Sequence, residues 1–191
     1  MTRDRYHWLG WGILATLALY AWSWGPLLPE MLWSCHVATA LVGLGLVAGS
    51  RRMVAAGFLF HAALGFPGFL LLVTAKQWFS AGSAWVHVLP LAAGGAYLRG
   101  RELPRSAVLD SWLILPLMIP ISYWLTPAWL NVNLSHGPWA PVAAYFPNFW
   151  SFYVSLGLVN LAALTLMRAI FNRLMRRTES EPNSKSKKAK N

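Results

Sequence analysis

Charged residues, and acidic ones above all, are scarce in this sequence. Only 12% of its 191 residues are Asp, Glu, Lys or Arg, only six are acidic, and 57% are hydrophobic. A soluble domain of this length typically has about 25% charged residues, so the composition excludes an ordinary soluble protein. Six apolar spans of about 20 residues would use most of the chain. The sequence therefore predicts an all-α, polytopic integral membrane bundle without a second globular domain.

Cysteine is nearly absent as well, since Cys35 is the only one in the chain. A single cysteine excludes an internal disulfide and leaves two roles for Cys35, inert packing or chemistry. The sequence also lacks closely spaced histidines of the kind that bind metals. We therefore expect no cofactor, although haem or metal ligation by histidines from separate spans stays open.

Basic residues are present, and their distribution predicts a topology. Hydropathy places six transmembrane helices at about residues 8–24, 31–49, 53–75, 82–98, 107–126 and 149–171. Every Lys and Arg except Lys76 then falls on one side of the membrane, which the positive-inside rule assigns to the cytoplasm. Both termini are cytoplasmic in this arrangement (N-in/C-in), and a bacterial chain would be a multi-pass protein of the inner membrane. The net charge of +10 is interpreted as a topology signal, so no nucleic acid partner is expected.

The chain divides into a membrane domain, residues 1–176, and a polar, lysine-rich tail, residues 177–191. We expect the tail to be disordered and cytoplasmic. Pro67 should kink or open the third span, because proline lacks an N–H and clashes with the preceding turn. The uncharged, aromatic connection 127–148 should lie on the outer membrane interface or fold back over the bundle.

Polar side chains inside the predicted spans are functional candidates, because they are costly in hydrocarbon. His36 and His87 each lie five residues below the outer start of a span, at a depth of roughly 7–8 Å for a helical rise of about 1.5 Å per residue. Cys35 belongs to the same layer. His61 and Asn160 are expected at a second, deeper level, where a hydrogen bond between helices is the simplest role. The outer connection supplies three further polar groups that could cover the first layer: Asn131, Asn133 and His136.

Three kinds of function fit this outer layer. In an acyl-lipid transferase or hydrolase, Cys35 is the nucleophile, His87 or His36 is the base, and an outer asparagine orients the imidazole or stabilises the oxyanion. Alternatively, His36 and His87, with or without His136, ligate a metal or haem iron. In the third case the bundle performs no chemistry and binds membrane lipids or another membrane subunit. The first case, with Cys35 and His87 as the catalytic pair, is the leading hypothesis.

Two segments carry a resemblance to a known family. Residues 28–36 (LPEMLWSCH) look like the start of the second helix in YwaF-type bacterial membrane proteins, and residues 131–133 with 137–139 (NVN and GPW) resemble the segment before that family's last helix. Relatives of this group include a cysteine- and histidine-dependent phospholipid acyltransferase. Residues 87–90 (HVLP) are similar to the histidine segment of the androgen-induced-gene lipid hydrolases. The resemblance covers most of residues 26–160 and implies a six-helix fold with acyl-lipid chemistry.

Overall fold

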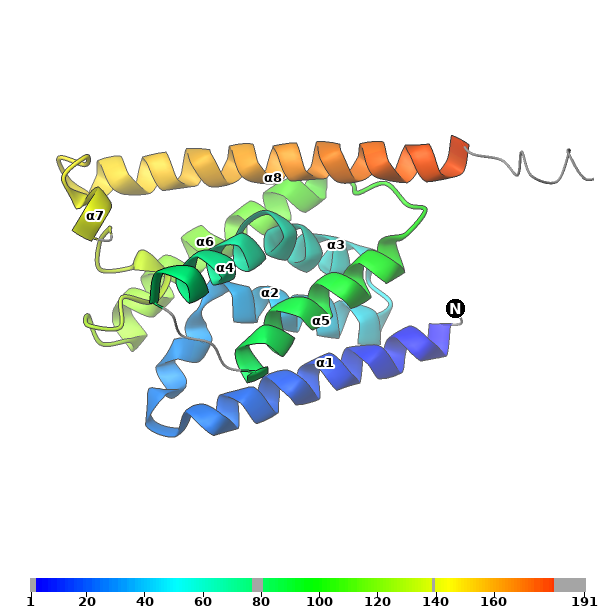
Figure 1. Cartoon of the computed structure of the whole chain (residues 1–191), viewed down its shortest axis with the longest axis horizontal. Helices are drawn as coiled ribbons and strands as arrows, with labels where there is room; N and C mark the ends of the chain where they lie inside the picture. The colour runs from blue at the N-terminus through cyan, green and yellow to red at the C-terminus, as the bar shows by residue number, and fades with distance from the viewer. Residues whose placement is uncertain (1–2, 77–80, 139, 181–191) are drawn as a thin grey trace, which may run out of the picture.

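The computed structural model describes residues 3–76, 81–138 and 140–180, and all regular secondary structure in those residues is helical. Figure 1 shows α1 and α8 along opposite sides of a bundle, with the other long helices between them. The predicted all-helical fold is confirmed. In chain order the elements are α1 (Arg3–Trp24), the 3₁₀ helix η1 (Gly25–Leu32), α2 (Ser34–Ala48), α3 (Arg51–Phe60), the π-helical turn η2 (His61–Gly65), α4 (Phe66–Lys76), α5 (Ala81–Leu98), α6 (Ser106–Leu125), the 3₁₀ turn η3 (Val132–Leu134), α7 (Ala140–Ala143) and α8 (Phe149–Ser180).

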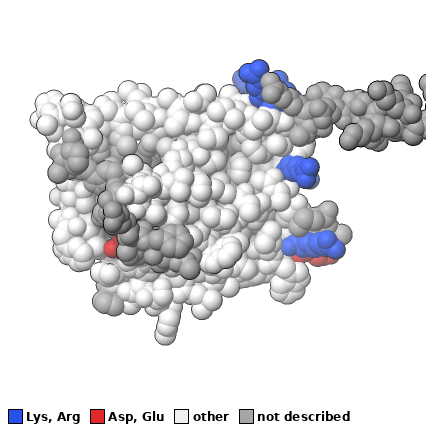
Figure 2. Space-filling model, in the orientation of Figure 1, with Lys and Arg blue, Asp and Glu red and all other residues white. Residues whose placement is uncertain are grey.

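The long helices run back and forth, so their connections gather at two ends of the bundle. α1 begins and α8 ends at the same end (Figure 1). The Lys and Arg side chains visible in Figure 2 gather at this end too. We call it the basic end, marked by Arg51, Arg52 and the loop 99–105, and we call the opposite end, which contains η1, η3 and α7, the distal end.

Local sequence explains where two of the helices break. Gly49 takes the left-handed conformation (φ 67°), and its N–H bonds the carbonyls of Gly45 and Leu46, which ends α2. The Ser50 side chain then accepts a hydrogen bond from the N–H of Met53 and starts α3. The α2–α3 connection is therefore a tight turn.

The predicted opening near Pro67 is confirmed. Proline cannot donate to the carbonyl one turn back, and its ring crowds that turn. The chain responds with the wider π-helical turn η2, closed by a bond from the Phe66 N–H to the His61 carbonyl. Such π turns are frequent at functional sites, and this one begins at a buried histidine.

The core centres on α2, which packs between α1 and α3. Ile13, Val42 and Leu164, from three different helices, are at most 1% exposed and belong to one apolar cluster. Helices α2 and α3 approach so closely that a Cβ added to Gly57 would lie 2.5 Å from the carbonyl oxygen of Ala38. Small residues at helix contacts are typical of membrane bundles.

Three helical stretches among the described residues are long and apolar enough to cross a membrane: Arg51–Leu71, Ser106–Leu125 and Phe149–Arg176. Helix α2 is apolar but shorter than these three stretches. The predicted span 31–49 began too early, because Gly25–Leu32 forms η1 and α2 starts only at Ser34. Crossing by six spans with both termini inside stays a prediction.

The predicted tail was wrong at its start. Helix α8 continues to Ser180, so residues 177–180 are helical. No glycine or proline occurs between Gly157 and Pro182, and arginines near a helix C-terminus complement its dipole. The remaining predicted tail, residues 181–191, lies outside the described residues.

Candidate functional site

A pocket of about 450 Å³ lies at the distal end of the bundle. Five of the eight polar residues singled out in the sequence line it: Cys35 and His36 from α2, His87 from α5, Asn133 from η3 and Asn160 from α8. The remaining walls are largely apolar, with Phe60, Leu64, Phe69, Leu115 and Leu156 among them. The pocket therefore combines a thiol and imidazoles with walls suited to a hydrocarbon chain.

Cys35 owes its position to the change from η1 to α2. Trp33 is extended (φ −56°, ψ 133°) and separates the two helices, so Cys35 is the second residue of α2. The side chain of Cys35 is partly buried, and no hydrogen bond joins its thiol to any residue that the structure describes.

Three histidine rings meet beside this cysteine. The ring centroids of His36 and His87 are 6.2 Å apart, and those of His61 and His87 are 5.7 Å apart. His87 also stacks on Phe69 at 4.4 Å. The nearness of His36 and His87 that their equal depth suggested is confirmed. The ring of His61, expected at a deeper level, also contacts that of His87, so it belongs to the same cluster.

Hydrogen bonding indicates the tautomer of His87. Its Nδ1 lies 2.8 Å from the carbonyl oxygen of Ser83. A carbonyl only accepts, so Nδ1 carries the proton and the lone pair is on Nε2. His87 is therefore set up as a base through Nε2, in an apolar pocket.

His61 is held by Thr39. Its Nε2 lies 2.8 Å from Oγ1 of Thr39, which also lies 2.9 Å from the carbonyl oxygen of Cys35 and 3.0 Å from that of Val86. The hydroxyl has one hydrogen, and the two carbonyls can only accept it. The arrangement with the most satisfied partners has Nε2–H of His61 donating to Thr39, which leaves the lone pair on Nδ1.

Two imidazole nitrogens in this cluster are unpaired. The Nδ1 atoms of His36 and His61 are buried and have no hydrogen-bond partner among the described residues, although the main chain of Glu30 and Met31 lies close to the His36 ring. A Cβ added to Gly65 would lie 2.8 Å from Nδ1 of His61 and 3.5 Å from Cβ of Cys35. Gly65 thus leaves free the space that the His61 nitrogen and the cysteine share.

Asn133 lines the pocket, but its amide is fully used elsewhere. Oδ1 accepts hydrogen bonds from the N–H and the hydroxyl of Ser34, and Nδ2 donates to the Leu32 carbonyl and the Ser122 hydroxyl, all at 2.8 Å. The residue adopts φ 56°, which Asn tolerates better than most side chains. Asn133 therefore joins the start of α2 to α6 and has no bond left for an imidazole or an oxyanion.

Asn131 and His136 do not line the pocket. The Asn131 side chain donates to the Gly137 carbonyl at 3.0 Å and accepts from the His136 N–H at 2.9 Å, which closes a local turn. The His136 ring lies against Tyr123, with centroids 4.9 Å apart. The predicted supporting role is thus met by neither residue in this structure; both shape the loop beside the pocket.

Asn160 of α8 also faces the pocket and is 7% exposed. The sequence led us to expect a hydrogen bond between Asn160 and His61. Asn160 forms no such bond, and its side chain bonds no other described residue. Sequence reasoning missed Thr39, Gly65 and Ser83 altogether. Only Pro67, which predicted an opening in the third span, pointed towards the region of Gly65.

Within the described part of the chain, no group of three His, Cys, Asp or Glu side chains is arranged to hold a metal ion. Metal or haem ligation by His36 and His87 stays a prediction.

No relative identifies this chain. No protein-family model matches it, and neither curated proteins nor solved structures show significant similarity to it. The resemblance to the YwaF-type proteins and the lipid hydrolases therefore depends on the quoted segments alone, and the function must be inferred from the pocket.

Proposed function

We propose that the chain is a six-span integral membrane protein. The support is an inverted distribution of polarity: histidines, serines and asparagines are buried, while large apolar side chains are exposed. On α8, Leu158, Val159 and Leu166 are 62–64% exposed, and on α6 Leu117 is 59% exposed. Water disfavours an apolar surface that follows whole helices, whereas lipid accepts it.

In this proposal the spans are α1, α2, the unit α3–η2–α4, α5, α6 and α8. The gathering of Lys and Arg at the basic end (Figure 2) supports a cytoplasmic location for that end. In a bacterial inner membrane the pocket then opens near the outer leaflet. A reporter that is active only in the periplasm, fused after Asn191, should stay inactive; activity there would overturn the topology.

We further propose that the pocket acts on acyl lipids, with Cys35 as nucleophile and His87 as general base. One observation carries this proposal: an apolar pocket of acyl-chain size holds the only thiol of the protein beside imidazoles. The phospholipid or other acyl ester would reach it from the surrounding bilayer.

The reaction follows from these two groups. Nε2 of His87 takes the proton of the thiol, and the thiolate attacks the acyl carbonyl carbon to form a C–S bond. The ester C–O bond breaks, and the imidazolium returns the proton to the leaving oxygen. Water, or the hydroxyl of an acceptor lipid, then attacks the thioester and restores the thiol. The thiol must rotate towards the imidazole first, as often happens when substrate binds.

Acylation of the purified protein by radiolabelled phospholipid tests the proposal. We expect a hydroxylamine-sensitive label on the wild type, none on Cys35→Ser, and labelling about a hundredfold slower or more for His87→Ala. His136→Ala is the matched control, because this histidine lies outside the pocket. Equal labelling of wild type and Cys35→Ser would remove the nucleophile, and equal rates for both histidine variants would remove the base.

A second candidate is a lipid- or subunit-binding protein without turnover. It is favoured by one specific observation, the lack of a hydrogen bond between the Cys35 thiol and any described histidine. The contacts of His61 with Thr39 and of His87 with Ser83 would then be purely structural. Stoichiometric lipid retention by Cys35→Ser, without acylation of the wild type, would support this candidate.

A further inference from the structure

A second hollow, of about 760 Å³, lies at the basic end between the loop 99–105 and the last turns of α8. Four arginines line it, one from the loop and three from α8: Arg105, Arg168, Arg173 and Arg176. Glu102 is the one carboxylate in the lining. The hollow belongs to a different end of the molecule from the cysteine pocket.

Most of the positive charge of this hollow is not neutralised by a carboxylate. Nε of Arg176 donates to Glu102 at 2.5 Å, which neutralises one cation. Arg105 and Arg173 form no hydrogen bond or ion pair with the described residues. Arg168 uses its Nε on the carbonyls of Leu103 and Pro104, and its two terminal nitrogens bond none of the described residues. Guanidinium groups without acceptors therefore surround an open space.

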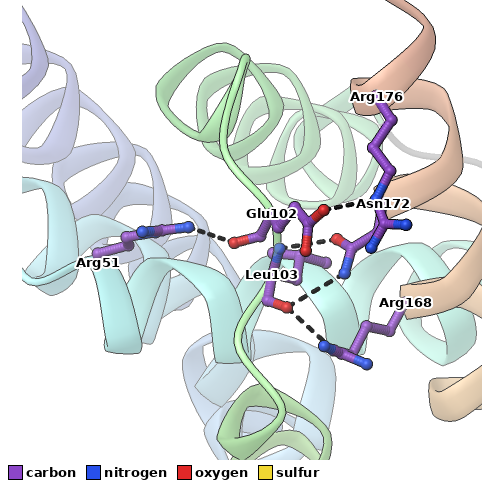
Figure 3. A network of polar contacts seen from close by, with 6 residues as sticks. All are labelled: Arg51, Glu102, Leu103, Arg168, Asn172 and Arg176. Atoms are coloured by element: carbon purple, nitrogen blue, oxygen red, sulfur yellow. Dashed lines mark hydrogen bonds and ion pairs between the residues drawn. The ribbon is translucent and has the colours of Figure 1, made fainter.

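The framework of the hollow is fixed by hydrogen bonds (Figure 3). Asn172 accepts from the Leu103 N–H at 2.7 Å and donates to its carbonyl at 3.3 Å. Arg51 of α3 donates to the Glu102 carbonyl. Leu103 is fully buried between these contacts. The loop is thus tied to α3 and α8, which fixes the backbone around the hollow before any ligand binds and lowers the entropic cost of binding.

We propose that this hollow binds the phosphate group of an anionic phospholipid from the leaflet at the basic end. Guanidinium groups match phosphate oxygens in charge and in fork geometry. A lipid is favoured over a soluble phosphate because apolar side chains continue from the rim along α8. Leu166, Ile170 and Leu174 are 63%, 44% and 51% exposed, and they alternate in sequence with the arginines. The acyl chains would lie along them.

The site requires the membrane location proposed above but not the chemistry at Cys35. A protein that binds lipid here and never becomes acylated would leave this inference intact. Conversely, acylation at Cys35 without selective lipid binding at the basic end would overturn only this inference.

The test is native mass spectrometry of the full-length protein in detergent, titrated with phosphatidylglycerol. The double variant Arg105→Gln/Arg173→Gln removes the two unpaired arginines and no internal bond. We expect its affinity for phosphatidylglycerol to fall by a factor on the order of ten. The matched control Arg5→Gln/Arg99→Gln loses the same charge from residues that do not line the hollow, and should bind as the wild type does.

Three outcomes decide between the sources of the phosphate. The proposal is supported if only the variant Arg105→Gln/Arg173→Gln loses affinity for phosphatidylglycerol and its thermal stability without lipid is unchanged. Equal losses in both double variants would mean general attraction to a basic surface and would overturn it. A third arm uses free glycerol phosphate; if this soluble anion binds as tightly and displaces phosphatidylglycerol, the ligand is not a lipid and the proposal fails.

Discussion

Two asparagines on α8 show how the two ends of the molecule differ. Asn160 and Asn172 are 7% and 6% exposed, so they are equally buried. Asn172, at the basic end, forms two hydrogen bonds with the main chain of Leu103. Asn160 faces the distal pocket and bonds no described residue. Because Asn160 lines the pocket, its amide is open to a ligand there.

The same difference extends to the neighbours of each asparagine. The main-chain groups of Glu102 and Leu103 at the basic end are bonded by Arg51, Asn172 and Arg168 (Figure 3). At the distal end, the Nδ1 atoms of His36 and His61 have no partner in the described chain. Satisfied polar groups fix a helix connection, whereas these histidine nitrogens beside the distal pocket are left without a bond to the described protein. This contrast supports the proposal that chemistry takes place at the distal end.

The largest expected effect tests Asn133, a distal residue whose side chain is fully hydrogen-bonded. Asn133→Leu removes four hydrogen bonds and leaves the Ser34 N–H and the Leu32 carbonyl without partners, so the protein should lose about 3–5 kcal/mol of stability. Thermal unfolding in detergent measures this loss. Asn131→Ala, which removes two bonds in an outer loop, serves as control and should cost clearly less. Similar losses for both variants would show that Asn133 is not the joint between α2 and α6.

The two asparagines of α8 give a matched pair with the next largest effect. Asn172→Leu should destabilise the bundle by about 1–3 kcal/mol, because the N–H of buried Leu103 loses its partner, while the Leu103 carbonyl keeps its bond from Arg168. Asn160→Leu should change stability by less than about 0.5 kcal/mol but reduce acylation at Cys35, since it fills part of the pocket. Unfolding and labelling of both variants would be measured side by side. A large loss of stability in Asn160→Leu would contradict the comparison.

A smaller effect is expected where the histidine cluster does have a partner. Thr39→Val keeps the shape of the side chain and removes the hydroxyl that joins His61, Cys35 and Val86. Single hydrogen bonds between membrane helices contribute about 0.6 kcal/mol on average, so the stability loss should be about 1 kcal/mol. The freed ring of His61 should also change the reactivity of the only thiol, measured as its alkylation rate. An unchanged alkylation rate would separate Thr39 from the site.

The sequence predicted which residues lie at the distal site better than it predicted the contacts between them. Equal depth along two spans placed His36 and His87 together, and the structure confirms them as neighbours. The contact of His61 with His87 was not predicted, because counting along one helix does not show which rings of neighbouring helices meet. Its partner Thr39 lies one helical turn after Cys35, but nothing in the sequence indicates that this turn faces α3.

The role of Asn133 could not be read from the sequence either. Its presence near the pocket followed from the loop position, but its four bonds depend on Ser34 and Ser122, which are far away along the chain. The predicted start of the second span was wrong for a related reason. Hydropathy does not distinguish an apolar 3₁₀ helix such as η1 from the first turn of a span.

The smallest expected effect concerns the exposed ion pair at the basic end. The hydrogen bond from Arg176, helped by its charge, holds the pKa of Glu102 below its ordinary value, against a smaller opposing effect of burial. A lowered pKa in the folded state stabilises the fold above the pKa of the unfolded state, about 4.3, and this contribution disappears as the pH falls through the folded-state pKa. Because both side chains are largely exposed, the effect should be small and weaken with salt. Unfolding temperatures of wild type and Glu102→Gln should therefore differ slightly at pH 6 and converge below pH 4. A difference that stays constant across this range would mean that the charge of Glu102 does not contribute to stability.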